Sequence, residues 1–221
     1  MVKRLALLCC MIVATLNGFS QKDSIQIQVM FSTNSDLLDN GETVLEGNDF
    51  SIEKCRFYLS NFSFYDGDST LISTQQAAQL VDLNDKESHL FKVACAKGAA
   101  FFSVGIGIDS LTNVSGVFGV ELDPTNGMYW SWQSGYINIK IEGEVKEGDN
   151  HSFAYHLGGY NPPFASYQTT RLFPLKTELV VRVNVEEFIE KTKNLNTDKV
   201  MRPGKEAAEL SRYFVTSIHV Q

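Results

Sequence analysis

The sequence has few of the residues and motifs that mark most enzyme and nucleic-acid sites. It contains 4 histidines, 4 cysteines and 5 prolines in 221 residues, and acidic side chains outnumber basic ones by 26 to 19. No nucleophile elbow, H-E-x-x-H, phosphate-binding loop or C-x-x-C pair occurs. No basic stripe is present, so we expect no nucleic-acid partner. No acid–base pair stands at a recognisable spacing, so we expect a protein that is not an enzyme.

The chain begins with a pattern typical of a secretory signal peptide. Lys3 and Arg4 precede an apolar run that ends at Leu16, and small residues follow it. This run is too short to be a dependable membrane span. We therefore expect residues 1–20 to be a signal peptide and residues 21–221 to form one exported domain, periplasmic or at the cell surface. Without Lys3 and Arg4 that domain has 17 basic and 26 acidic side chains, a formal charge of −9.

Cysteine is almost absent from the expected mature chain. A lipoprotein acylated at Cys9 or Cys10 is the weaker alternative to simple export, because Leu8 stands where a small residue is wanted. Cys55 and Cys95 are then the two that remain. An isolated pair in an exported protein is most simply a disulfide, and two thiolate metal ligands would call for closer spacing. We predict a Cys55–Cys95 disulfide.

Most of the chain alternates apolar and polar residues, which is typical of β-strands. Strands are expected within these ranges: 25–31, 55–59, 62–64, 101–108, 137–141, 153–157 and 179–185. The apolar positions switch parity after Ser60-Asn61, which indicates a bulge. Asn184 and Glu187 predict the start of a short helix, and Pro203-Gly204 opens a second. The sequence therefore predicts an all-β fold, a single antiparallel β-sandwich with long loops and a short C-terminal helix on its edge.

Two loops, 109–127 and 158–175, are expected to meet at one end of the sandwich and to form its main pocket. In the first loop, Asp109, Asn113 and Asp123 are expected to hydrogen-bond loop amides. Calcium binding by Asp109, Asp123 and Glu121 is a weaker alternative, because their spacing matches no known calcium loop.

The segment from Gly127 to Tyr136 holds both tryptophans, Trp130 and Trp132, around a single serine. In an extended segment they point to opposite faces. One ring then fills the core while the other faces the surface or a site; a core anchor that opens a strand is an equally good interpretation. His156 and His219 suit copper only if they converge with this segment.

Several segments, in this order, resemble the MbnP-like family of copper-associated periplasmic proteins, in its Bacteroidetes-type branch. The most specific is Met128-Tyr-Trp-Ser-Trp-Gln-Ser-Gly-Tyr136, and weaker matches lie at Leu122-Asp-Pro124 and His156-Leu-Gly-Gly159. The late Ile218-His-Val220 and the early Phe57-Tyr-Leu-Ser-Asn61 are also similar to that branch.

The resemblance implies a β-sandwich and an exported copper-handling protein, in which an oxidised tryptophan and histidines hold the metal. Trp130 or Trp132 would be the oxidised residue, with His156 and His219 as imidazoles. It also implies a dihaem peroxidase-type partner or an outer-membrane receptor. Glu121 stands where copper-associated members have a histidine, and a carboxylate is a poor ligand for Cu(I). The alternative hypothesis is therefore a non-catalytic surface interaction module that keeps the scaffold without a copper site.

Overall fold

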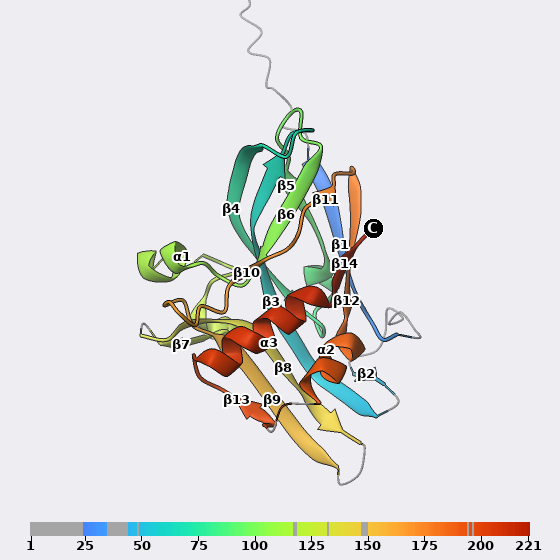
Figure 1. Cartoon of the computed structure of the whole chain (residues 1–221), viewed down its shortest axis with the longest axis vertical. Coiled ribbons are helices and arrows are strands. Elements are labelled where there is room, and N and C mark those ends of the chain that lie inside the picture. Colours follow the sequence, from blue (N-terminus) through green and yellow to red (C-terminus); the bar gives the residue numbers. More distant parts are fainter. Residues whose placement is uncertain are drawn as a thin grey trace, which may run out of the picture.

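The computed structural model describes residues 24–34, 44–47, 49–116, 119–131, 133–146, 150–193, 195 and 197–221. The expected signal peptide and Trp132 lie outside the described residues. Two β-sheets pack face to face, with two helices against them (Figure 1). The predicted all-β sandwich with a C-terminal helix is confirmed. In the described part of the chain, no helix is long and apolar enough to cross a membrane.

The smaller sheet is formed by the first and last strands of the chain and two internal strands. Its order is β14-β12-β1-β5, and the strands are β1 (Ser24–Ser32), β5 (Leu90–Ala94), β12 (Glu178–Asn184) and β14 (Ile218–Val220). The strands β1 and β12 run parallel, and the other pairs in this sheet are antiparallel. The alternation read from the sequence places Ile25, Ile27, Val29 and Phe31 in the core, and all four are buried.

The larger sheet is built around one long strand, β3 (Phe50–Tyr65). Its path is β10-β6-β3-β8-β9-β13, and β2 and β4 pair with the other edge of β3. The strands are β2 (Leu45–Glu46), β4 (Leu71–Asp82), β6 (Phe101–Ile106), β8 (Gly135–Val145), β9 (His151–Gly158), β10 (Gln168–Thr169), β11 (Phe173–Pro174) and β13 (Lys199–Val200). A short β7 (Tyr129–Ser131) pairs with β8, and β13 runs parallel to β9.

The predicted bulge in β3 is confirmed. Its register with both β4 and β6 shifts just after Ser60, and Asn61 has a φ of 48°. The shift turns Phe62 and Phe64 to the same core that receives Cys55, Phe57 and Leu59 before it, so one strand serves the core along its whole length.

Helices are short, and all but α3 begin with a side-chain cap. They are η1 (Lys86–His89), α1 (Ser110–Ser115), η2 (Pro124–Asn126), α2 (Val185–Thr192) and α3 (Lys205–Thr216). The predicted cap of α2 is confirmed, because the Asn184 side chain accepts from the Glu187 amide at 3.1 Å.

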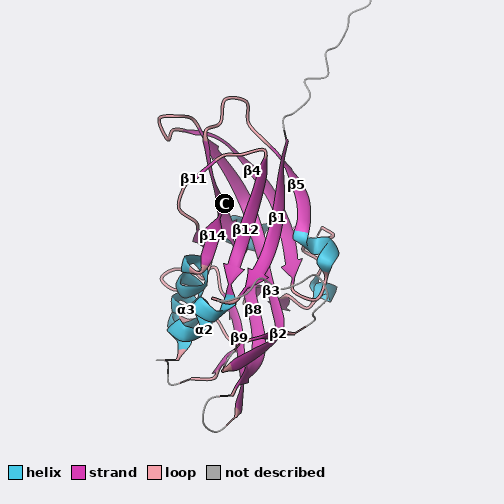
Figure 2. Ribbon diagram, turned by 90° about the vertical axis from the view of Figure 1, so that its right-hand side faces the viewer, coloured by secondary structure: helices cyan, strands magenta, loops and turns pink. Residues whose placement is uncertain are grey.

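The C-terminal helix α3 packs on the core face of the larger sheet, and not on the edge of the sandwich as predicted. Its Phe214 ring lies 5.2 Å from Phe57 of β3 and 5.6 Å from Phe188 of α2. Phe31 of the smaller sheet reaches the same Phe57 ring at 6.2 Å. The smaller sheet and helices α2 and α3 therefore together cover the core face of the larger sheet (Figure 2).

The predicted Cys55–Cys95 disulfide is wrong in this structure, where both residues carry thiols. Phe31 near the end of β1 packs on Phe57, which is close to Cys55, whereas Ser24 at the start of β1 pairs with Ala94, next to Cys95. The two cysteines thus lie near opposite ends of β1, roughly 20 Å apart at about 3.3 Å per strand residue. A disulfide needs Cα atoms about 4.4–6.8 Å apart. Burial raises the pKa of the Cys55 thiol, with a smaller contribution from Asp82.

Candidate functional site

The chain between 119 and 131 folds back over the outer face of the larger sheet. Leu122 and Met128 are buried there against two tyrosines, Tyr58 of β3 and Tyr136 of β8. The Tyr58 hydroxyl donates to the Glu121 carbonyl oxygen at 3.1 Å, and the Tyr136 hydroxyl donates to the Leu122 carbonyl oxygen at 2.9 Å. Burial raises the pKa of Tyr136 to about 12, so its hydroxyl keeps the proton that it donates. The two tyrosines therefore anchor this segment to the sheet.

The turn at η2 sets the shape of that segment. The Asp123 carboxylate accepts from the Thr125 amide at 2.8 Å and from the Thr125 hydroxyl at 2.7 Å, and Pro124 supplies a fixed φ at the first helical position. Hydrogen bonds from the Thr125 hydroxyl, and then from its amide, lower the pKa of Asp123. Gly127 ends the turn with a φ of 71°, a left-handed conformation that favours glycine. Asp123 thus caps a turn, and the chain then enters β7.

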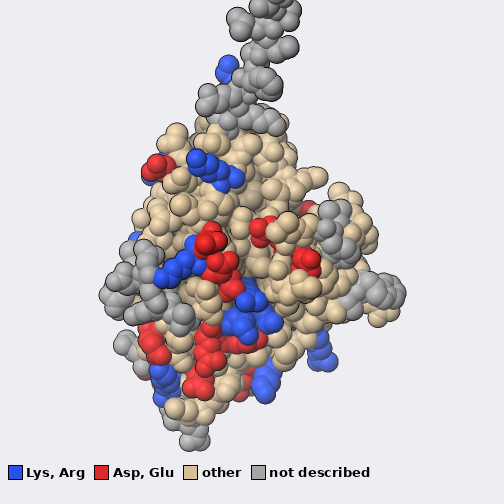
Figure 3. All heavy atoms as spheres, turned by 180° about the vertical axis from the view of Figure 1, so that it is seen from behind, with Lys and Arg blue, Asp and Glu red and all other residues tan. Residues whose placement is uncertain are grey.

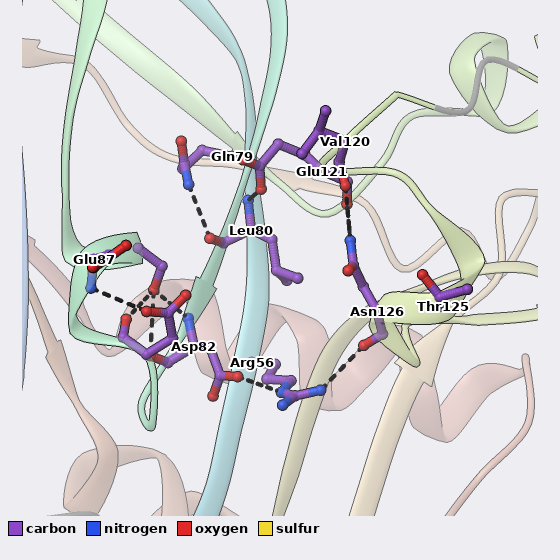
Figure 4. A pocket seen from close by; sticks show the side chains of 11 residues that line it. Arg56, Gln79, Leu80, Asp82, Glu87, Val120, Glu121, Thr125 and Asn126 are labelled. Atoms are coloured by element: carbon purple, nitrogen blue, oxygen red, sulfur yellow. Dashed lines mark hydrogen bonds and ion pairs between the residues drawn. The ribbon is translucent and has the colours of Figure 1, made fainter.

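A groove of about 500 Å³ lies between this segment, β4 and η1 (Figure 4). Its lining residues come from β3, β4, the η1 turn and the 119–126 segment: Arg56, Gln79, Leu80, Asp82, Asp85, Glu87, Ser88, Val120, Glu121, Thr125 and Asn126. Polar groups predominate among them. The groove is therefore a site for hydrogen bonding and charge, unlike the mostly apolar pockets that enclose small molecules.

The floor of the groove is held by an ion pair. Arg56 Nε lies 2.7 Å from Asp82 Oδ2, and Arg56 Nη1 donates to the Asn126 carbonyl oxygen at 3.1 Å. Arg56 on β3 therefore links β4 on one side of the groove to the 119–126 segment on the other. The lining residues include four carboxylates and only this one guanidinium, so the groove is acidic overall.

Glu121 closes the edge of β4 beside the groove. Its carboxylate accepts from the Leu80 amide at 2.9 Å, and the Gln79 side chain donates to the Leu80 carbonyl oxygen at 3.0 Å. These are the main-chain groups that a neighbouring strand would otherwise bind. The resemblance places Glu121 at a metal-ligand position, and here its carboxylate accepts a hydrogen bond from the backbone of β4.

A row of charges crosses the outer face of the larger sheet beside this segment (Figure 3). Glu142 accepts from Lys54 Nζ at 2.6 Å and pairs with His156 Nε2 at 2.7 Å, while Lys140 Nζ donates to the Gly127 carbonyl oxygen at 3.2 Å. His156 is buried, with two lysines near it. Its imidazole therefore makes a structural hydrogen bond to a carboxylate that is ion-paired with Lys54.

The two long loops meet, as predicted, beside the tryptophan segment. The Ser110 hydroxyl donates to the Tyr160 carbonyl oxygen at 3.0 Å, and the Asn113 Oδ1 accepts from the Tyr136 amide at 2.9 Å. Asp109 caps α1 by accepting from the Thr112 amide at 2.7 Å. Hydrogen bonds from Thr112 and Asn61 lower the pKa of Asp109, although burial alone would raise it. Asp109 and Asn113 thus hold loop geometry, as Asp123 does.

Asn138 links both loops through the core. Its Oδ1 accepts from the Ile108 amide at 2.8 Å, and its Nδ2 donates to the Ser166 hydroxyl at 2.8 Å. The side chain is buried, and a Cβ atom on Gly107 would lie 2.4 Å from its Cγ.

A smaller cavity of about 220 Å³ lies between these residues: Gln133, Ser134, Gly159, Tyr160, Asn161, Pro162, Phe164, Pro203 and Gly204. The first loop lines the 500 Å³ groove and the second loop lines this smaller cavity, so neither is the predicted main pocket formed by both loops beside the tryptophans.

The residues predicted as copper ligands do not form one site. His219 lies on β14 of the smaller sheet and pairs with Glu187 at 2.8 Å, whereas His156 lies on β9 of the larger sheet and Glu121 caps β4. In the described residues no group of three or more His, Cys, Asp or Glu side chains is placed to hold a metal ion. Of the predicted ligands that the structure describes, Trp130 lies near His156. The Trp130 ring packs against Gly158, where an added Cβ atom would lie 2.7 Å from Trp130 Cζ3. Gly158 is two residues from His156, so both are on the same face of β9.

The site residues predicted from the sequence did not include Arg56, Asp82, Gln79 and Asn126. Arg56 and Asp82 read as ordinary polar positions in strands, and they meet only because β3 and β4 pair in this register. The available signal was Asp82 after the apolar Leu80-Val81 pair, which marks the polar end of a strand.

The His156–Glu142 pair predicts a loss of stability in mild acid. Burial lowers the pKa of His156 below its ordinary value of 6.5, and this effect outweighs the hydrogen bond that His156 donates to Glu142. The unfolded chain therefore takes up a proton at pH values where folded His156 does not, so stability is lost as pH falls below 6.5. We expect His156→Gln, which keeps an N–H donor for Glu142, to flatten the free energy of unfolding between pH 6.5 and 5 in urea titrations. Equal slopes for the two proteins would contradict this origin.

Comparison with known proteins gives the family. A family model described as MbnP matches residues 22–205. MbnP from Methylosinus trichosporium has a similar structure, with a TM-score of 0.52 and 13% sequence identity, over 76% of this chain and 77% of that chain. None of the curated proteins matches the chain. The structural likeness concerns the fold, and the family model spans most of the sequence. The chain therefore belongs to the MbnP family.

Proposed function

We propose that this protein is an exported, non-catalytic binding module of the MbnP family, and that it engages a partner through the groove between β4, η1 and the 119–126 segment. The observation that carries the proposal is the groove itself, with its acidic lining on a floor fixed by the Arg56–Asp82 pair. The signal-peptide pattern in residues 1–20 supports export to the periplasm or the cell surface.

The state of the polar groups supports binding rather than catalysis. The Ser88 hydroxyl donates to the Asp85 carbonyl oxygen at 2.5 Å and accepts from the Asp82 amide at 3.0 Å. The Glu121 carboxylate binds a main-chain amide. A hydroxyl nucleophile would need an adjacent base to accept its proton. The Ser88 hydroxyl in this groove donates to a backbone carbonyl oxygen instead.

The test is site-specific photo-cross-linking in the native host. Thr125 is exposed on the groove wall, and Glu178 is exposed on the smaller sheet. We expect a benzophenone amino acid at position 125 to give an adduct with one partner protein, and the same residue at position 178 to give none. A dihaem peroxidase-type enzyme and an outer-membrane receptor are the partners that the family resemblance implies. Equal labelling from both positions, or none from 125, would reject the groove as the binding site.

Copper handling is the second candidate, and one observation favours it: Trp130 lies on the face of β9 that also carries His156. Indole N–H is a donor and cannot ligate a cation through its lone pair, so this candidate requires an oxidised tryptophan that supplies an amine. Intact-mass measurement on protein from the native host, followed by Cu(I) competition titration, tests it. Unmodified tryptophans together with no competition for Cu(I) would exclude copper and leave the binding module.

A further inference from the structure

The strand β4 has an outer edge that no described strand covers. β4 pairs with β3 on one side, and in Figure 1 it lies at the margin of the larger sheet. From Leu71 to Leu80 it contains no charged residue, proline or glycine, and Leu71 and Ile72 are 55% and 42% exposed. Protein edges are usually protected by lysine, proline or a covering segment. An uncharged edge of this length is suited to receive another strand.

The direction of the main-chain groups on this edge follows from one hydrogen bond. The Leu80 amide points away from β3, because it donates to the Glu121 carboxylate. Groups two residues apart on a strand point the same way, so the Ala78 amide also faces outward. Glu121 and Gln79 satisfy the edge only at Leu80. From Leu71 to Ala78 no described strand pairs with this edge, so it is open to a ligand.

The open edge leads directly into the acidic groove. Gln79 and Leu80 belong both to β4 and to the groove lining. An extended segment paired along 71–78 would thus bring its end to Glu87 and Glu121. Both residues line the groove, in which Arg56, the one cation of the lining, is already paired with Asp82. Charge complementarity therefore selects a cationic end for the segment.

We propose that the groove and the β4 edge together receive an extended peptide segment of a partner protein, which adds to β4 as a strand and places lysine or arginine in the groove. This inference rests on the proposed function and names the class of partner. The main chain of the segment supplies affinity along the edge, and the basic side chain fixes its position.

The probe is a labelled ten-residue peptide of alternating threonine and valine that ends in two lysines, and its counterpart ends in two glutamates. Fluorescence anisotropy with the chain from 21 to 221 measures binding. We expect the lysine peptide to bind more tightly, and the E87Q/E121Q double variant to weaken it roughly tenfold. Glutamine at position 121 keeps an oxygen for the Leu80 amide. The matched control is E144Q/E178Q, which removes the same charge from exposed positions outside the groove lining, and it should bind as the parent does.

The strand pairing is tested at Ala78. Proline there removes an outward amide, a change that an edge strand tolerates on its solvent side, whereas Ala78→Ser keeps the amide. We expect Ala78→Pro to abolish peptide binding and Ala78→Ser to retain it, with both variants showing the circular dichroism spectrum of the parent. Equal binding of the two peptides, or of the two variants, overturns the inference. A cross-link from position 125 in the same protein would then leave the groove as the binding site and remove only the strand-adding partner.

Discussion

Phe214→Ala is expected to lower the free energy of unfolding by about 3–5 kcal/mol. The Phe214 ring is fully buried and contacts Phe57 and Phe188. Its removal leaves a cavity where α3, α2 and β3 meet, and three packed elements cannot all collapse into it. Urea unfolding followed by tryptophan fluorescence measures the change.

The matched control for this variant lies in the same helix. Arg212 is exposed on α3, so Arg212→Ala should change the free energy of unfolding by less than about 0.5 kcal/mol. Alanine has the highest helix propensity, so helix propensity cannot explain a loss in either variant. A similar loss in both variants would show that the packing of Phe214 on the larger sheet is not the source of stability.

Asn138→Leu is expected to cost about 2–4 kcal/mol, although leucine has a similar size. The substitution leaves the buried Ile108 amide without its acceptor and removes the donor to the Ser166 hydroxyl. Each buried polar group left without a partner costs about 1–3 kcal/mol. Ser166 also donates to the Gly159 carbonyl oxygen at 3.1 Å, so it keeps one bond and the total stays below the sum.

The same variant should loosen both long loops, because Asn138 is their common support. Hydrogen exchange measured by mass spectrometry is expected to rise in peptides that cover 108–116 and 159–167. Asn161→Leu, at an exposed position of the second loop, serves as the control. Unchanged exchange in the first loop of the Asn138 variant would contradict the shared support.

The strands that carry a full apolar face were predictable from the sequence. In β1 and β3 the alternation identifies the buried residues, and the parity switch after Ser60 identifies the bulge, because core packing fixes which side chains point inward. The capping residue Asn184 identifies the start of α2. These features depend on local sequence and one buried face.

The strand β4 could not be predicted in this way. Between Gln75 and Gln79 it has two alanines and three glutamines, and no apolar face, because it projects along the margin of the sheet. The register of β3 on β4 creates the Arg56–Asp82 pair and the groove, and pairing between strands is not encoded in the pattern of either one. The disulfide prediction failed for the same reason: spacing in the sequence says nothing about which ends of β1 the two cysteines approach.

The parallel pair of β1 and β12 constrains the order in which the molecule can be made. The Asn34 amide binds the Glu186 carboxylate across 152 positions of the chain, and β1 aligns with β12 from Gln26 to Ser32. A chain that leaves a ribosome or a translocation channel amino end first presents β1 long before its partner exists. The smaller sheet is therefore complete only after residue 184 has emerged, although β5 can pair with the first half of β1 before then. Such distant pairing makes folding slow, and a chain that ends before β12 cannot complete the smaller sheet.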